Sequence, residues 1–202
     1  MTSRPSSSLD VTKILVIIAS TRPGRLGLPI ANWAVSEIEK HGGFEVDVAD
    51  LALMDLPMLD EPQQAYHRNY SKPHTIAWSK RVDAADAILI VTPEYNYGMP
   101  GSLKNALDFL YHEWSYKPVA FVSYGGMSGG MRSVQMAKQV VSTMKMVPLP
   151  EAVNIHMVPK YIHDGQFVPD ETHEKSLKRV LDELTRWAVA LRAMRMTQPA
   201  PA

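Results

Sequence analysis

Two uninterrupted apolar runs constrain the fold of this chain more than any other feature. Residues Lys13–Ala19 and Ala87–Thr92 are rich in Ile, Leu and Val, and polar residues do not alternate with apolar ones inside them. Such runs are typical of strands covered on both faces, as in a parallel sheet. After the first run the apolar spacing becomes helical, at Ile30, Ala34 and Ile38. The pattern therefore predicts an α/β protein.

Strand and helix alternate five times along the chain. Strands are predicted at residues 13–19, 44–49, 87–92, 119–123 and 152–158, helices at about 30–41, 76–85, 102–111, 129–146 and 177–191, and a long loop at 53–73. Right-handed crossovers then give one five-stranded parallel sheet with helices on both faces. We choose the strand order 2-1-3-4-5, because the loops suited to a ligand follow strands one, three and four, and ligands bind where the strand order reverses.

Length and composition fit a single domain. The chain has 202 residues, enough for one sizeable core, and we expect a domain at 13–196 between flexible tails at 1–12 and 197–202. Lys plus Arg and Asp plus Glu number 21 each, so no net field favours nucleic acid or an anionic membrane. The absence of cysteine excludes disulfides and thiolate chemistry and fits a cytoplasmic protein. We expect neither a secretory signal nor a membrane span.

The loop after the first strand is suited to an anion. Residues Ser20–Gly27 lie between a buried strand and the start of a helix, where free backbone N–H groups and the helix dipole favour negative charge. Two hydroxyls and two guanidiniums add donors for a phosphate monoester. The segment is neither a Walker loop nor a G-x-G-x-x-G fingerprint. The alternative is an ordinary turn with a solvated arginine.

Two further loops follow the third and fourth strands. Pro93–Gly98 carries two tyrosines, a proline and an amide, which suit a flat ring with polar edges better than a phosphate. Ser123–Gly130 contains four glycines, which allow positive φ and close approach of the backbone to a ligand. The alternative for the second of these loops is a flexible segment with a helix cap. The carboxyl ends of parallel strands are where open α/β sheets bind ligands, so the three loops support one another.

These loops carry a resemblance to a known family. Ser20–Arg25, Pro93–Asp108 and Ser123–Arg132 together resemble the NADPH-dependent FMN reductase family, which includes quinone, chromate and azo-dye reductases. The resemblance covers roughly Lys13 to Val158, with the motifs in the same order. The Pro-Glu-Tyr-Asn stretch that runs into Leu-Lys-Asn-Ala is its most specific part. The family has a flavodoxin-like fold, binds FMN without a covalent bond and commonly forms dimers or tetramers.

The resemblance implies a set of cofactor-binding residues. Ser20 and Arg22 would hold the phosphate of FMN; the isoalloxazine ring would contact Pro93, Glu94, Tyr95, Asn96 and Tyr97; and its pyrimidine edge would lie along Ser123, Gly125 and Gly126. Many members also use a Ser and an Asn in the first loop, where this chain has Arg25, Leu26, Gly27 and Leu28. We expect Arg25, or the backbone N–H groups of Leu26 and Gly27, to replace them.

The expected activity follows from the same resemblance. It implies an FMN-dependent oxidoreductase in which NADPH or NADH supplies a hydride and a quinone, flavin, azo compound or metal oxyanion accepts the electrons. Because the flavin supplies the redox chemistry, we assign no catalytic side chain and no metal ligand. The alternatives are a flavodoxin-type electron carrier and a flavin-free binding module. We also expect a homodimer or homotetramer, because the helix after Tyr97 carries apolar residues on more than one side.

Overall fold

A five-stranded parallel sheet forms the centre of the molecule. The structure is a computed structural model that describes residues 11–197. The strands run in the order β2-β1-β3-β4-β5, as predicted, and every neighbouring pair is parallel. Their bounds are β1 Thr12–Ile18, β2 Phe44–Asp50, β3 Ala87–Pro93, β4 Pro118–Tyr124 and β5 Val147–Ile155. The flavodoxin-like fold inferred from the sequence is therefore confirmed.

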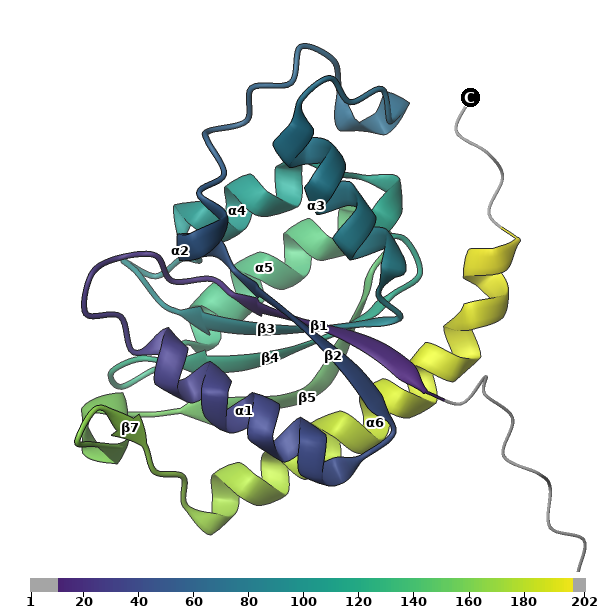
Figure 1. The fold of residues 1–202 in the computed structure, drawn as a ribbon. Coiled ribbons are helices and arrows are strands. Elements are labelled where there is room, and N and C mark those ends of the chain that lie inside the picture. Colours follow the sequence, from purple (N-terminus) through teal and green to yellow (C-terminus); the bar gives the residue numbers. More distant parts are fainter. Residues whose placement is uncertain (1–10, 198–202) are drawn as a thin grey trace, which may run out of the picture.

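Helices cover both faces of the sheet (Figure 1). Helices α1 and α6 lie on one face, and α3, α4 and α5 lie on the other, with the short α2 beside them. The bounds of the helices are α1 Gly27–His41, α2 Leu51–Met54, α3 Pro73–Ala84, α4 Gly101–Asp108, α5 Met131–Thr143 and α6 Glu171–Met196. Three 3₁₀ turns and a small hairpin complete the described chain: η1 Ala65–His67, η2 His112–Trp114, η3 Val158–Tyr161, β6 Ile162–His163 and β7 Gln166–Phe167.

The core consists of two apolar layers, one on each side of the sheet. All seven residues of β3 and all seven of β4 are buried, which explains their uninterrupted hydrophobicity. Burying one large aliphatic side chain contributes about 1.5–3 kcal/mol, so these central strands contribute much of the stability. In contrast, β2 lies at an edge, and exposure alternates only over its first four residues; Val48 is exposed as well, and Ala49 and Asp50 are buried.

The fifth strand differs from the prediction. It begins at Val147 rather than at residue 152, although it contains Pro148 and Pro150. Proline donates no hydrogen bond and is tolerated where a strand has only one neighbour, and among the described strands β5 pairs only with β4. The prolines broke the sequence pattern, but the edge position accommodates them. The segment expected as a loop at 53–73 contains the end of α2 and the turn η1.

The tails and the fourth helix need two further corrections. Thr12 belongs to β1, whereas the sequence placed it in a tail; most of the two expected tails lies outside the described residues. Of the apolar side chains expected to give the helix after Tyr97 a second partner surface, Tyr111 is half-buried and the others are buried within the chain, on α4 and just after it: Leu103, Ala106, Leu107, Phe109 and Leu110. Trp78 and Trp114 pack in the same layer and donate from their indole nitrogens to Ala106 and Leu107 carbonyls. Among the described residues, no helix is both long enough and apolar enough to cross a membrane.

Candidate functional site

Three loops meet at the carboxyl ends of β1, β3 and β4. They are numbered after the strand in sequence order that each one follows, as the first, third and fourth loops. They surround a cavity of about 320 Å³, together with the segment after β5. Strand order reverses between β1 and β3, so the cavity lies at the switch point of the sheet. Its lining residues are Arg22, Leu26, Pro93, Glu94, Tyr95, Tyr124, Gly125, Gly126, Met157, Val158 and Pro159.

The first loop presents unused hydrogen-bond donors to this cavity. Arg22 is exposed and its guanidinium has no partner within residues 11–197. In the same described part of the chain, the backbone N–H groups of Thr21 and Gly24 also donate to no acceptor. Helix α1 starts at Gly27 without a side-chain cap and without an acidic residue in its first turn. An uncapped helix start beside a free guanidinium is suited to an anion.

Arg25 belongs to the same loop but is engaged elsewhere. Its guanidinium lies 2.5 Å from Asp50 Oδ1 and 2.5 Å from Oδ2, and it donates to the Ser20 carbonyl at 2.9 Å. Asp50 also caps α2 by accepting from the N–H of Ala52. Burial by itself raises the pKa of Asp50, but the hydrogen bonds from Arg25 and Ala52 outweigh it and lower that pKa. Arg25 therefore holds the loop against the end of β2.

Two hydroxyls lie beneath the first loop. Ser20 Oγ and Tyr124 OH are both buried and have no hydrogen-bond partner in the described structure. Both crowd the point where a Cβ on Gly27 would lie, at 2.3 Å and 2.7 Å. Burial raises the pKa of Tyr124, so its phenol keeps its proton at neutral pH. Only glycine fits at the start of α1 above this pair.

The third loop forms a tight turn that exposes an aromatic ring. Tyr95 and Gly98 exchange two backbone hydrogen bonds, of 3.0 and 2.9 Å, and Asn96 and Tyr97 between them have positive φ. Two consecutive positive φ values mark a type I′ turn. Tyr95 lines the cavity, whereas the side chain of Tyr97 points outward and that residue is 72% exposed.

A buried carboxylate fixes the outer side of that turn. Glu94 accepts from Ser128 Oγ at 2.7 Å and from the backbone and Nε of Arg132 at 3.1 and 2.5 Å. Burial raises the pKa of Glu94, but these hydrogen bonds outweigh burial and lower it, so the carboxylate stays ionised. The guanidinium of Arg132 in turn lies 3.6 Å from the centre of the Tyr97 ring. A cation above a ring stabilises both side chains.

The fourth loop is shaped by glycine and held by the end of β5. A Cβ on Gly130, whose φ is +83°, would lie 2.8 Å from both Ser123 Cβ and the Tyr124 nitrogen. Ser123 Oγ lies 2.8 Å from the Gly129 carbonyl and 2.9 Å from Asn154 Oδ1. The N–H groups of Met157 and Val158 donate to the carbonyls of Gly126 and Gly125. These hydrogen bonds hold the loop in place along one side of the cavity.

The sequence located the cavity but missed part of its wall. Of the proposed residues, Arg22, Leu26, Pro93, Glu94, Tyr95, Gly125 and Gly126 line it, whereas Ser20, Arg25, Gly27, Asn96, Tyr97 and Ser123 lie beneath or beside it. Tyr124 and the Met157–Pro159 segment were not proposed. Tyr124 stands between two proposed residues, so its position was a usable signal; nothing in the sequence pattern marked the segment after β5.

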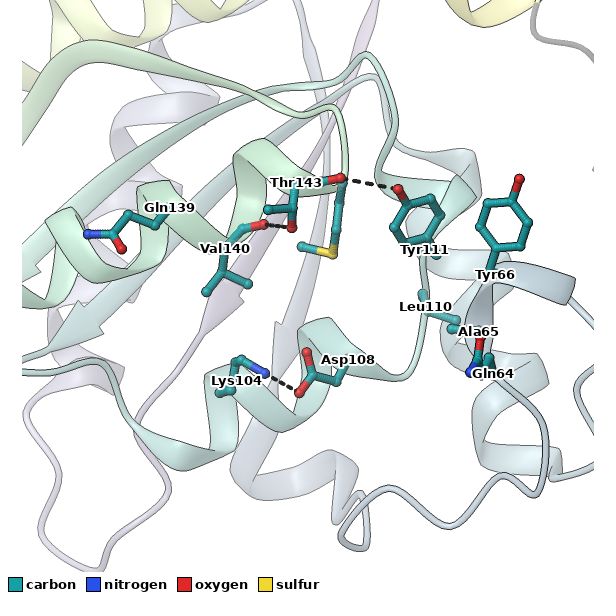
Figure 2. A pocket seen from close by; sticks show the side chains of 11 residues that line it. Gln64, Ala65, Tyr66, Lys104, Asp108, Leu110, Tyr111, Gln139, Val140 and Thr143 are labelled. Carbon is teal, nitrogen blue, oxygen red and sulfur yellow. Dashed lines mark hydrogen bonds and ion pairs between the residues drawn. The ribbon is translucent and has the colours of Figure 1, made fainter.

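A second hollow is larger but has no comparable chemistry. It has a volume of about 550 Å³ and lies between α4, α5 and η1, away from the carboxyl ends of the strands (Figure 2). Lys104 pairs with Asp108 along α4, and the Tyr111 hydroxyl donates to the Thr143 carbonyl at 3.2 Å. These polar groups are satisfied by one another. No group of three or more potential metal ligands occurs in the part of the chain that the structure describes.

The profile of the NADPH-dependent FMN reductases matches residues 12–160. This chain belongs to that family. A Schizosaccharomyces pombe protein named as an NAD(P)H-dependent FMN reductase is 42% identical over 149 residues, which cover 72% of this chain and 74% of the relative. A Solanum tuberosum NAD(P)H:quinone oxidoreductase is 32% identical over 192 residues, covering 90% and 95%.

A solved structure supports the fold. The FerB flavoenzyme of Paracoccus denitrificans, an NAD(P)H:(acceptor) oxidoreductase, superposes with a TM-score of 0.71 at 24% identity and covers 89% of this chain and 98% of its own. The family assignment makes this chain an oxidoreductase that uses FMN and takes electrons from NAD(P)H.

The residues around the cavity fit that cofactor. The donors of the first loop suit one phosphate monoester, and the buried hydroxyls beneath it lack partners. The aromatic and proline side chains of the third loop and the glycines of the fourth provide apolar and backbone surfaces for a flat ring.

Proposed function

We propose that this chain transfers electrons from NAD(P)H through FMN to a small acceptor of the quinone class. The observation that carries this proposal is the convergence of the three loops on one cavity, with anion donors at one end and an exposed aromatic turn at the other. Relatives named as quinone oxidoreductases and as FMN reductases support it. Bound FMN would supply hydride acceptance and electron transfer.

Each part of the cavity would have its own task. Arg22, Ser20 and the start of α1 would hold the phosphate of the cofactor. Pro93, Glu94 and Tyr95 would orient its ring, and Gly125 and Gly126 would contact the pyrimidine edge through the backbone. Ser123 would act indirectly, because its hydroxyl already lies against Gly129 and Asn154. These assignments agree with the chemistry of each side chain and its place around the cavity.

The open side of the ring would face Asn96 and Tyr97. Their turn stands at the mouth of the cavity, and Arg132 places a positive charge above Tyr97. Asn96 offers a short polar side chain and Tyr97 a flat apolar face, which suit a planar acceptor. No side chain need act as an acid, a base or a nucleophile, since the residues of the protein bind and orient while the cofactor reacts.

The electron-carrier alternative is less favoured. Such carriers are usually strongly acidic, whereas this chain has 21 basic and 21 acidic residues. We also propose that the protein is cytoplasmic and binds neither nucleic acid nor membranes, which its charge balance and lack of cysteine support.

Kinetics with both nicotinamides test the proposal. In a reductase, NADPH or NADH alone should bleach the visible absorbance of the flavin, without air and without an acceptor. Nicotinamide must leave before a quinone takes its place over the ring, so double-reciprocal plots should be parallel. An electron carrier would show negligible bleaching by either nicotinamide, and that result would contradict the proposal. Replacing quinone with free flavin, an azo dye or chromate then ranks the acceptors.

A further inference from the structure

The two unpartnered hydroxyls beneath the first loop belong to different strands. Ser20 follows β1, and Tyr124 is the last residue of β4, with β3 between these strands in the sheet. The tyrosine therefore reaches past the end of β3 to place its hydroxyl beside Ser20 and under the first residue of α1. A buried hydroxyl without a partner is destabilising. A pair of them at one place suggests that a ligand completes their hydrogen bonding.

The two hydroxyl protons of Ser20 and Tyr124 indicate that the ligand is a hydrogen-bond acceptor. Two adjacent hydroxyls can form one hydrogen bond with each other, which uses one of their two protons. The other proton remains available, so the pair as a whole is a donor. A phenol is more acidic than an aliphatic hydroxyl and donates more readily, which leaves the serine proton as the free one. The neighbouring guanidinium of Arg22 and the uncapped start of α1 favour a negatively charged acceptor.

We propose that Tyr124 is a positioning residue for the phosphate of FMN. Its hydroxyl donates to Ser20 Oγ and thereby directs the Ser20 proton to a phosphate oxygen held by the first loop. This inference rests on the proposed function, because it takes the phosphate to bind in that loop. The Ser20–Tyr124 pair would replace the phosphate contact expected of Arg25, since the guanidinium of Arg25 is bound to Asp50 and to the Ser20 carbonyl.

Gly27 is part of the same arrangement. A Cβ at this position would lie within 2.7 Å of both hydroxyl oxygens, so a larger residue and the Ser20–Tyr124 pair exclude each other. The tyrosine hydroxyl occupies the space that a side chain at position 27 would fill. The chain thus places a donor from β4 at the start of α1.

Comparison of two ligands isolates this contact. FMN and riboflavin differ by the phosphate, so the dissociation constant of riboflavin divided by that of FMN measures what the phosphate contributes. We would titrate the apoprotein with each flavin and follow the quenching of flavin fluorescence. The variants are Tyr124→Phe, Ser20→Ala and the double variant, and Tyr111→Phe is the matched control because its hydroxyl lies in the other hollow.

The expected results follow from an indirect role. Tyr124→Phe should lower the ratio about 2–10-fold, the effect of one neutral hydrogen bond, and leave riboflavin affinity within twofold. Ser20→Ala should lower it at least as much, and adding Tyr124→Phe to Ser20→Ala should change nothing further. The thermal midpoint of the flavin-free Tyr124→Phe protein should change little, because the variant removes one hydrogen bond within the pair and also one desolvated hydroxyl. Tyr111→Phe should leave the ratio unchanged.

Several outcomes would overturn the assignment. Equal losses for FMN and riboflavin would make Tyr124 a wall of the ring site, and an independent loss in the Ser20→Ala background would make it a separate contact. An unchanged ratio in Tyr124→Phe would remove it from phosphate binding altogether. If the parent protein bound both flavins equally, or neither, the proposed phosphate loop itself would be wrong. An unchanged ratio in Ser20→Ala would also overturn the proposal, so it stays testable even if Tyr124→Phe fails to fold.

Discussion

Arg22 and Arg25 lie three residues apart in one loop, yet they have opposite surroundings. Arg22 is exposed and has no partner in the described chain, whereas both amino groups of Arg25 are bound to Asp50. The first arrangement leaves a charge available for a ligand, and the second uses the charge to hold the backbone. The two residues should therefore respond differently to the same substitution.

Arg22→Ala should weaken FMN binding without weakening the fold. A charge-assisted hydrogen bond contributes about 1.5–3 kcal/mol, which corresponds to roughly 10–150-fold in the dissociation constant. Riboflavin should bind the variant and the parent equally, because it lacks the phosphate. Fluorescence titration measures both, and a matching loss of riboflavin affinity would show that Arg22 does not bind phosphate.

Arg25→Ala should have the complementary effect. Its removal leaves the buried carboxylate of Asp50 without its ionic partner, and breaking a buried pair costs on the order of 3 kcal/mol. Urea unfolding of the flavin-free proteins should therefore show a large loss for Arg25→Ala and almost none for Arg22→Ala. Equal midpoints for the two variants would contradict the structural role of the pair.

The role of a residue was predictable from the sequence where it depends on the residue's neighbours in the chain. The free donors of Arg22 could be anticipated from a loop between a buried strand and a helix. The ion pair of Arg25 could not be anticipated, because it depends on Asp50, which lies 25 positions away at the end of β2. The same limit applies to Tyr124, whose role depends on reaching past a neighbouring strand. Long-range pairs of this kind leave no periodicity in the sequence.

At the scale of elements, the β4–α5 loop depends on one glycine more than on its neighbours. Gly130 has φ +83° and no room for a Cβ, whereas Gly126 in the same loop has nothing within 4 Å of that position. Gly130→Ala should destabilise the protein by about 1–3 kcal/mol, from backbone strain alone, and shift Ser123 and Tyr124. Gly126→Ala is the matched control and should leave the unfolding midpoint unchanged. Urea denaturation distinguishes the two, and equal midpoints would show that the loop can relax.

The segment between α2 and α3 is held by hydrogen bonds to a carboxylate, and their strength depends on pH. Glu61 accepts from the backbone N–H groups of Ser71 and Lys72 at 2.9 Å each, next to the start of α3. Burial raises the pKa of Glu61, but these hydrogen bonds outweigh it and lower that pKa to about 2. A lowered pKa stabilises the fold above the ordinary value of 4.5, and this stabilisation is lost as the pH falls towards 2.

Glu61→Gln should therefore lower the urea midpoint at pH 7 and reduce its decline between pH 4.5 and pH 2. Glu45→Gln is the control, because Glu45 is exposed and, within residues 11–197, its only ion pair is a 3.7 Å contact with Lys13. Identical pH profiles for Glu61→Gln and the parent would show that the carboxylate does not fasten the segment.

For the whole molecule, the parallel sheet was predictable because β1 and β3 are covered on both faces and so lack polar alternation. The early start of β5 was not, because its prolines are compatible with a strand only at an edge. Assembly is a harder case. The apolar residues of α4 suggested a partner surface, but the chain buries them itself. An apolar count along a helix does not tell which neighbour will cover each side.

One set of exposed apolar side chains lies on α5 and the loop before it. Met131 and Met136 on α5 are 44% exposed, Met127 before them is 89% exposed, and the Met136 sulfur lies close to Gly98 in the turn that carries Tyr97. Grouped exposed side chains of this kind favour contact with another protein surface. We propose that a second copy of the chain covers this surface in a homodimer or homotetramer.

Light scattering tests this arrangement. The parent protein at micromolar concentration should give a particle of at least twice 22.5 kDa. Met131→Glu combined with Met136→Glu should shift it towards a single chain, because charges on a buried apolar contact are costly. Leu53→Glu is the control, since Leu53 is 81% exposed but belongs to α2, a different element. A parent particle of 22.5 kDa would refute the assembly. An oligomer that persisted in the double variant would place its interface on another face of the molecule.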